Sequence, residues 1–474
     1  MGKRDGNNNG IRNLLIALII LFIVATGIII KLCLDLTTEP IQQVTDKTPV
    51  SLPIADREAV PTESTVETTI PEPEHVVSTA SIGAMGDLLM HKPIFDDLTK
   101  YNAAVQQKDG SYDFSTVFQY LSEYTSALDF AVANLETTLA AEDNGYAYNG
   151  YPLFNCPDEV VDGVKDAGFD MLLTANNHSY DTSLIGFKRT LEVIRGKGLK
   201  TLGTYLSADE TKWTVQEING IKIGMMSYTY ATGEAEAGRP SLNNNQAISE
   251  AGLCNYFNTN NLDSFYTEVE GYLEEMKDAG AEATILFIHW GVEYILEENQ
   301  TQNAMAQKLC DLGIDVIIGG HPHVVQPVEL LTSTAEPEHK TVCLYSMGNA
   351  VSNQRLGFSQ AISTPHTEDG ILFTVTFEKY SDGTVYLAQV NGLPTWVNKH
   401  RNENGKDEYN ILPLDDSNRD TWQNKYGLND STMKSCTESF DRTMKIVGEG
   451  IEQANEYLDQ EKAERDAYYL SLVS

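Results

Sequence analysis

The stretch IDVIIGGHPHVVQPVE, residues 314–329, places two histidines directly after a short apolar run. The run Val316–Ile318 is typical of a buried strand, and the two glycines after it allow a sharp turn or a close approach to a ligand. His321 and His323 follow, separated by a proline that restricts the backbone and holds both side chains in place. Such a pair can be two hydrogen-bonded loop residues or part of a metal site. Taken alone, the pair favours the structural interpretation, and further ligands at the same place would reverse that preference.

Other apolar runs end in the same way, on a residue that can bind a metal or move a proton. These residues are Asp87 after IGAMG, Glu136 after VANL, Asn177 and His178 after LLTA, and His289 after ILFI. Segments with helical periodicity separate several of the runs, at 183–196, 262–279 and 303–312. Strands alternating with helices indicate an α/β fold, in which sites form beyond the carboxyl ends of the strands. We therefore predict that these residues meet at one edge of the fold.

The chemistry of the set is that of a metal site. Carboxylates, an amide and imidazoles together suit Mn, Fe or Zn, and this set is large enough for one or two divalent ions. Such ions polarise a phosphoryl or acyl oxygen and lower the pKa of a bound water. Asp181 follows His178 by three residues and can orient it, so His178 is a candidate general acid as well as a candidate ligand.

Two further residues are possible members of the pocket. Glu293 could orient His289 or could be an exposed residue at the start of a helix. Asn349, in SMGNAV, could line the pocket or could stabilise a turn.

The composition limits the partners. The chain has 474 residues and a formal net charge of -35, which argues against a nucleic-acid partner because duplex binding needs clustered Lys and Arg. An anionic substrate would have to be held by a local positive centre such as a metal. Cys156 and Cys254 lie in loop-like sequence and could pair outside a cell, although nothing in the sequence requires it.

The amino-terminal region indicates a membrane protein. Residues 1–12 are basic and are expected to be cytoplasmic, and residues 13–34 form an apolar run long enough to be an uncleaved transmembrane signal anchor. This places the rest of the chain outside the cell membrane, which it crosses once. Residues 35–77, rich in Thr, Pro and Glu, are expected to form a disordered acidic stalk. We expect a folded domain at 78–415 and a helical tail at 416–474.

Six motifs carry a family resemblance. In chain order they are MGDLLMH, VANLETTL, DMLLTANNHSYDTS, ILFIHWGVEY, DVIIGGHPHVVQPVE and LYSMGNAV. Over roughly residues 78–413 they resemble the CapA family of poly-γ-glutamate capsule biosynthesis proteins, which is similar to the calcineurin-like metallophosphoesterases. The resemblance implies a four-layer α/β/β/α sandwich of the metallophosphoesterase type, outside the membrane. It also implies a role in making, exporting or anchoring an anionic γ-linked glutamate polymer.

The resemblance also implies roles for individual residues. By position these are Asp87 as the first metal ligand, Glu136 as the bridging carboxylate, Asn177 as the amide ligand, His178 as the histidine that assists the leaving group, and His289, His321 and His323 as the remaining ligands. The first motif departs from the metallophosphoesterase pattern Asp-x-His, because Asp87 is followed by two leucines and His91 comes two residues late. Whether the site holds one ion or two therefore stays open.

Three functions are compatible with these features. The first is a metal-dependent hydrolase or transferase acting on a γ-glutamyl polymer or another envelope substrate, and the retained Asn177, His178, His321 and His323 favour it. The second is a non-catalytic ectodomain that binds the polymer or capsule synthase subunits, which the missing Asp-x-His histidine favours. The third is a phosphoesterase for envelope phosphoesters.

Overall fold

The computed structural model describes residues 73–96, 102–244 and 247–473, which belong to one compact unit, Ile70–Ser474. The expected basic segment and membrane anchor, and nearly all of the expected stalk, lie outside the described residues. Within the described ranges, no helix has the length and apolar character needed to span a membrane.

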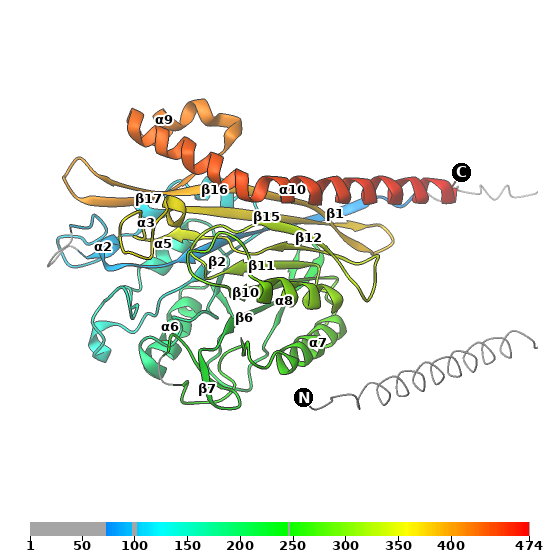
Figure 1. Ribbon diagram of the computed structural model, residues 1–474, viewed down its shortest axis with the longest axis horizontal. Coiled ribbons are helices and arrows are strands. Elements are labelled where there is room, and N and C mark those ends of the chain that lie inside the picture. The colour runs from blue at the N-terminus through cyan, green and yellow to red at the C-terminus, as the bar shows by residue number, and fades with distance from the viewer. Residues whose placement is uncertain (1–72, 97–101, 245–246, 474) are drawn as a thin grey trace, which may run out of the picture. The chain divides into compact units, whose positions relative to one another are not determined.

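The first sheet has the strand order β17-β16-β15-β1-β2-β3-β4, and β14 pairs with β1 (Figure 1). Its strands are β1 (Val76–Leu88), β2 (Phe130–Leu135), β3 (Met171–Leu173), β4 (Lys200–Leu202), β14 (Asn349–Val351), β15 (Asp369–Tyr380), β16 (Val385–Arg401) and β17 (Asp407–Pro413). Strands β1 to β4 are parallel, whereas β15, β16 and β17 form an antiparallel extension from β1. The parallel half therefore brings the ends of β1, β2 and β3 to one edge, where their polar residues lie.

The second sheet has the order β12-β13-β11-β10-β6-β5, and β9 pairs with β6. Its strands are β5 (Thr214–Ile218), β6 (Ile221–Tyr230), β9 (Tyr256–Phe257), β10 (Ala283–His289), β11 (Val316–Gly320), β12 (Val328–Thr332) and β13 (Lys340–Leu344). The hairpin of β5 and β6 turns at Asn219 and Gly220, whose φ angles of 49° and 78° suit the Asn-Gly turn of a two-residue hairpin. A separate hairpin joins β7 (Gly233–Glu236) to β8 (Arg239–Ser241).

Three hydrophobic clusters establish the layers. The inner faces of the two sheets share one core, which includes Ile82 of β1 and Phe287 of β10. The outer face of the first sheet packs against the 114–125 and 160–194 regions, and the outer face of the second sheet packs against α7 and α8. The helices are α2 (Lys92–Phe95), α3 (Ser115–Phe118), α4 (Ser122–Thr125), α5 (Val160–Asp166), α6 (Ser183–Gly196), α7 (Asp263–Asp278), α8 (Gln300–Asp311), α9 (Trp422–Lys425) and α10 (Asp430–Val473). The predicted four-layer α/β/β/α arrangement is confirmed by this packing.

Helix α10 is 44 residues long and runs lengthwise along β15 and β16 (Figure 1). Its residues Val447, Ala454 and Leu458 enter the core between the sheets. Near its start, Arg442 donates hydrogen bonds to the buried carboxylate of Asp369 at the beginning of β15. The helix therefore completes the inter-sheet core rather than extending into solvent.

We predict that Gly450→Ala destabilises the fold, because a Cβ at Gly450 would lie 1.9 Å from the carbonyl oxygen of Val328 on β12. Such overpacking typically costs about 1–3 kcal/mol of unfolding free energy. Gly448→Ala on the same helix is the matched control, since its Cβ would meet nothing closer than Met444 Cε at 3.6 Å. That change should raise stability by up to about 1 kcal/mol through helix propensity. Urea unfolding measures both variants, and equal stabilisation of the two would contradict the close contact between α10 and β12.

Candidate metal centre

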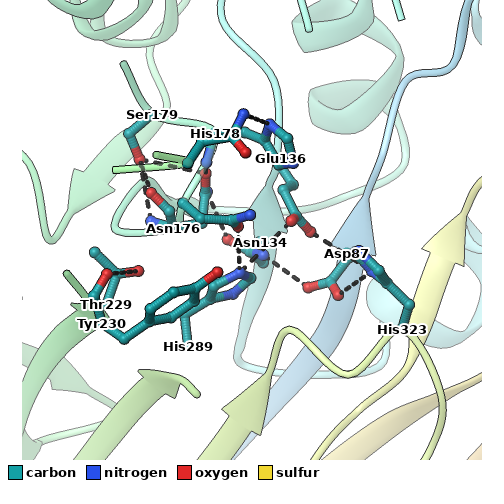
Figure 2. A network of polar contacts seen from close by, with 12 residues as sticks. Asp87, Asn134, Glu136, Asn176, His178, Ser179, Thr229, Tyr230, His289 and His323 are labelled. Atoms are coloured by element: carbon teal, nitrogen blue, oxygen red, sulfur yellow. Dashed lines mark hydrogen bonds and ion pairs between the residues drawn. The ribbon is translucent and has the colours of Figure 1, made fainter. Parts of the chain in front are cut away.

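The predicted ligands come from both sheets and converge at the carboxyl ends of their strands. Asp87 lies near the end of β1, Glu136 directly follows β2, and Asn177 lies in the turn after β3. His289 is the last residue of β10. The turn that contains His321 and His323, here called the HxH turn, directly follows the neighbouring strand β11. Figure 2 shows Asp87, Glu136, His289 and His323 turned toward one another. The expectation that polar residues at the carboxyl ends of strands meet, here called the strand-end rule, therefore located one site.

Two groups of ligand atoms form within this site, and they share Glu136. Asp87, Glu136 and His323 make one group, while Glu136, His289 and His321 make the other, with the atoms of each group within 4.8 Å of one another. His323 Nδ1 lies 3.1 Å from Asp87 Oδ2 and 4.0 Å from Glu136 Oε2. His289 Nε2 lies 3.5 Å from Glu136 Oε1. Each group would hold one ion, and Glu136 would serve both.

Unsatisfied buried atoms fit this interpretation. Both carboxylate oxygens of Glu136 and the Nδ1 atom of His321 are buried without a hydrogen-bond partner. Leaving such atoms unpaired costs free energy unless another group satisfies them. Asn177 Oδ1 adds a neutral oxygen 2.9 Å from His289 Nε2. Mn, Fe and Zn bind oxygen and imidazole nitrogen atoms whose lone pairs are free, so the residues present fit a metal.

The electrostatics of the site also suit a cation. Burial and then the charge of Asp87 raise the pKa of Glu136 well above its usual value. Burial opposes ionisation of Asp87 as well, but the hydrogen bond and charge of His323 outweigh it and lower the pKa. Burial lowers the pKa of His289 to about 3 and that of His321 well below its usual value. The imidazoles of His289 and His321 are therefore neutral, as metal ligation requires, and a divalent ion would relieve the repulsion between the two carboxylates.

The HxH turn is held in a strained backbone conformation. His321 and His323 have φ angles of 97° and 56°, a region that costs non-glycine residues about 1–3 kcal/mol each. The two glycines before the turn are explained by close packing, since a Cβ on Gly319 would lie 2.0 Å from the carbonyl oxygen of Tyr345. A Cβ on Gly320 would lie 3.2 Å from Asp87 Oδ1, so glycine keeps this space clear. Strain at two adjacent ligands is typical of a functional site.

His178 and Asp181 form a hydrogen-bonded pair beside the ligand groups. His178 Nδ1 lies 2.6 Å from Asp181 Oδ2, and the same oxygen accepts a hydrogen bond from the backbone N–H of Phe154 at 2.7 Å. Asn243 Nδ2 donates to Asp181 Oδ1 at 3.0 Å. The carboxylate therefore holds the proton on Nδ1 and leaves Nε2 for proton transfer, as expected for a general acid or base.

The weaker candidates lie outside the two ligand groups. His91 is buried, accepts a hydrogen bond from the backbone N–H of Asn353 at 3.3 Å, and does not replace the absent histidine of the first motif. Burial lowers its pKa to about 3. Asn349 donates to the carbonyl oxygen of His323 at 3.2 Å, so it supports the turn from behind. Glu293 is exposed in a turn, and its charge contributes to the raised pKa of Glu136. Because α8 begins at Gln300, the interpretation of Glu293 as a helix-start residue is wrong.

Several supporting residues were missed in the sequence. Asn134 donates to Asp87 Oδ1 at 2.7 Å, and Asn176 donates to Asn134 Oδ1 at 3.1 Å. Asn134 lies in the motif VANL and Asn176 in TANNH. Their position next to predicted ligands is the sequence feature that could have indicated them. Tyr230, at the end of β6, has its ring centroid 4.8 Å from that of His321, and the strand-end rule also applied to it. Asn243 lies in irregular sequence that offered no signal.

Cys156 and Cys254 do not pair with each other. Both thiols are buried and free, so the possible disulfide between them is absent.

Comparison with known proteins places the chain in a family. A family model described as bacterial capsule synthesis protein PGA_cap matches residues 81–354. The PGA biosynthesis protein CapA of Bacillus subtilis (strain 168) is 27% identical over 278 residues, which cover 58% of this chain and 63% of that protein. The capsule biosynthesis protein CapA of Bacillus anthracis is 25% identical over 355 residues, covering 72% of this chain and 74% of that protein.

Among solved structures, a putative 5'-nucleotidase from Staphylococcus aureus in complex with alpha-ketoglutarate has a TM-score of 0.37 and 15% sequence identity, covering 77% of this chain and 58% of that chain. The family match spans more than half of the chain and contains every residue of the two ligand groups. The chain therefore belongs to the bacterial capsule synthesis protein family PGA_cap.

Proposed function

We propose that this protein is a metal-dependent hydrolase or transferase, of the metallophosphoesterase type, that acts outside the cell membrane on a capsule polymer. The single observation that carries the proposal is Glu136, a buried carboxylate shared by two ligand groups and left without hydrogen bonds. In this proposal two divalent ions of the Mn, Fe or Zn type occupy the groups. Residues 13–34 anchor the protein in the cytoplasmic membrane. The substrate is poly-γ-glutamate or a related anionic envelope polymer, in a pathway shared with capsule synthase subunits.

The reaction would divide between the metal ligands and the His178–Asp181 pair. When bound, the ions would polarise the scissile phosphoryl or acyl group and supply a nucleophile from water. Asp87, Glu136, Asn177 and the three histidines would hold them. His178, kept in one tautomer by Asp181, would deliver a proton from Nε2 to the leaving group.

One observation favours a second candidate, a non-catalytic ectodomain that binds polymer or synthase subunits. The position of the Asp-x-His histidine is occupied by Leu89, which is buried at 1% exposure, so the first group has fewer imidazoles than the metallophosphoesterase pattern. Activity measurements separate the two candidates.

We expect His178→Ala to keep its metal and to lose activity by roughly 10²–10⁴-fold, because it removes a general acid and leaves the ligand groups in place. The measurement is release of glutamate oligomers from poly-γ-glutamate, and of phosphate from phosphoesters, by the metal-loaded protein. His400→Ala is the control, since His400 is a partly exposed residue of β16 that pairs with Glu408 and belongs to neither ligand group. Release of neither product by the native protein would favour the non-catalytic ectodomain. Release of phosphate alone would identify an envelope phosphoesterase.

A further inference from the structure

Exposed hydrophobic side chains gather around the candidate metal centre. Eleven large hydrophobic side chains are exposed in the described part of the chain, and six of them lie in three loops, residues 148–154, 291–297 and 354–362, here called the rim loops. The six are Tyr151, Leu153, Val292, Ile295, Leu356 and Phe358. Single exposed apolar residues are ordinary, but a cluster of them marks a binding surface.

Ring contacts connect each rim loop to the site. In the first loop, the Phe154 ring lies edge-on to His178, with centroids 4.7 Å apart. In the second, the Tyr294 ring lies 6.1 Å from that of the ligand His323. In the third, the Phe358 ring lies 5.8 Å from that of His91, which itself packs on Phe154. One ring of each rim loop therefore packs against the site or against His91, and the exposed apolar side chains lie in the same three loops.

The rim loops offer no unpaired positive charge. Arg355 is the only Lys or Arg in them, and it forms an ion pair with Glu368 at 2.9 Å. Lys92 packs against the first loop, where a Cβ on Gly150 would lie 2.7 Å from its backbone nitrogen, and it is paired with Asp96 at 3.1 Å. Glu293, which is exposed, adds a negative charge to the second loop. A polyanionic chain, or an anionic bilayer, would thus find repulsion here rather than complementary charge.

We propose that the centre acts on an amphiphile, whose polar reacting group reaches the metal ligands and whose hydrocarbon part lies on the rim loops. This inference rests on the metal-dependent activity of the proposed function, but it replaces the bare anionic polymer named there with a related envelope substrate that carries a hydrocarbon part. The exposed apolar side chains of the rim loops would attract a hydrocarbon group, and this attraction increases with the hydrocarbon area removed from water. A substrate in the envelope polymer pathway that carries a lipid or another hydrocarbon carrier has this chemistry.

The test uses the full chain, loaded with Mn²⁺ and held in nanodiscs of phosphatidylcholine. Its probes are ethyl-, butyl- and hexylphosphonate, which cannot be hydrolysed at a phosphoester bond. Calorimetry is expected to show affinity rising from ethyl- to hexylphosphonate by roughly tenfold or more, since each fully buried methylene contributes up to about fourfold. The double variant Leu356→Ser/Phe358→Ser should lose this gain while binding ethylphosphonate as the native protein does.

The matched control is Leu470→Ser/Leu472→Ser, which removes two exposed leucines near the end of α10. It should keep the full dependence on chain length. Equal affinity along the series, with ethylphosphonate still bound, would overturn the amphiphile proposal and assign the rim to contact with another protein surface. Binding of no phosphonate by the native protein, or ethylphosphonate binding unchanged in Glu136→Gln, would instead overturn the metal centre on which the inference rests.

Discussion

Glu136→Gln is expected to abolish binding of both metal ions, whereas loss of a ligand from one group should abolish one. Glu136 is the residue common to the two groups, and neither of its oxygens has a hydrogen-bond partner among the described residues. A glutamine keeps the shape but replaces the anionic bridge with a neutral amide, which is a poor bridging ligand. We expect about two ions per chain in the native protein, about one in Asp87→Asn or His289→Ala, and about none in Glu136→Gln, by elemental analysis after dialysis.

The design separates metal loss from misfolding. Metal-free Glu136→Gln should be at least as stable as the metal-free native protein, because the substitution removes a buried carboxylate that lacks hydrogen bonds. Glu293→Gln is the matched control, since it removes an exposed acid near the site and should leave metal content unchanged. Retention of one ion by Glu136→Gln would show that the two groups do not depend on a common bridge.

Arg442→Met is expected to lower the free energy of unfolding by about 3 kcal/mol near pH 8, because it leaves the carboxylate of Asp369 buried and without its countercharge. In the native protein Arg442 Nη2 lies 2.6 Å from Asp369 Oδ1, and Ser439 donates to the same oxygen at 2.6 Å. The Asp369 side chain is only 2% exposed, so water cannot replace the lost partner. Urea unfolding at several pH values is the measurement.

The pH dependence of Arg442→Met follows from the same pair. Burial raises the pKa of Asp369 to about 7 even against the lowering effect of Arg442, and removal of Arg442 raises it further. A carboxyl group with a raised pKa in the folded state favours folding when protonated, so this contribution is present below about pH 4 and is lost as the pH rises through the folded-state pKa. The deficit of the variant should therefore be smaller at pH 5 than at pH 8.

Two further variants test this assignment. Asp369→Asn/Arg442→Met should remove most of the added pH dependence, because no ionisable group remains at the contact. Lys434→Met, in an exposed pair with Glu438 on the same helix, should change stability by no more than about 0.5 kcal/mol. A deficit that is equal at both pH values would mean that lost packing, not the buried charge, accounts for the effect.

The ligands could be predicted from sequence because parallel strands deliver their carboxyl ends to one edge. Asp87, Glu136 and His289 each follow an apolar run directly, and this pattern can be recognised without knowing which strands pair. The sharing of Glu136 was expected only from the family resemblance, because it depends on how the two sheets face each other and leaves no local signal in the sequence. The hydrogen bond from Asn243 to Asp181 spans 62 residues, and irregular sequence gives no indication of such a contact.

In the fold too, elements with a local sequence signal could be predicted, whereas elements set by long-range pairing could not. The strand β11 was predicted from its apolar run, and the structure confirms it. The turn at Asn219 and Gly220 carries an equally local signal, the Asn-Gly pair. Strand β16 runs to Arg401 although it contains Gly392 and Pro394, because its pairing with β15 continues through both residues. Long-range pairing of this kind overrides the local preference of Gly and Pro.

The candidate metal centre takes its ligands from the ends of strands in both sheets: Asp87, Glu136 and Asn177 from the first, and His289, His321 and His323 from the second. An ion bound by ligands from both sheets would therefore link the two sheets to each other. Separation of the two sheets would require release of the ion, and any ligand that binds only the folded state stabilises that state according to its free concentration. The supply of divalent metal would then affect the stability of the fold as well as its chemistry.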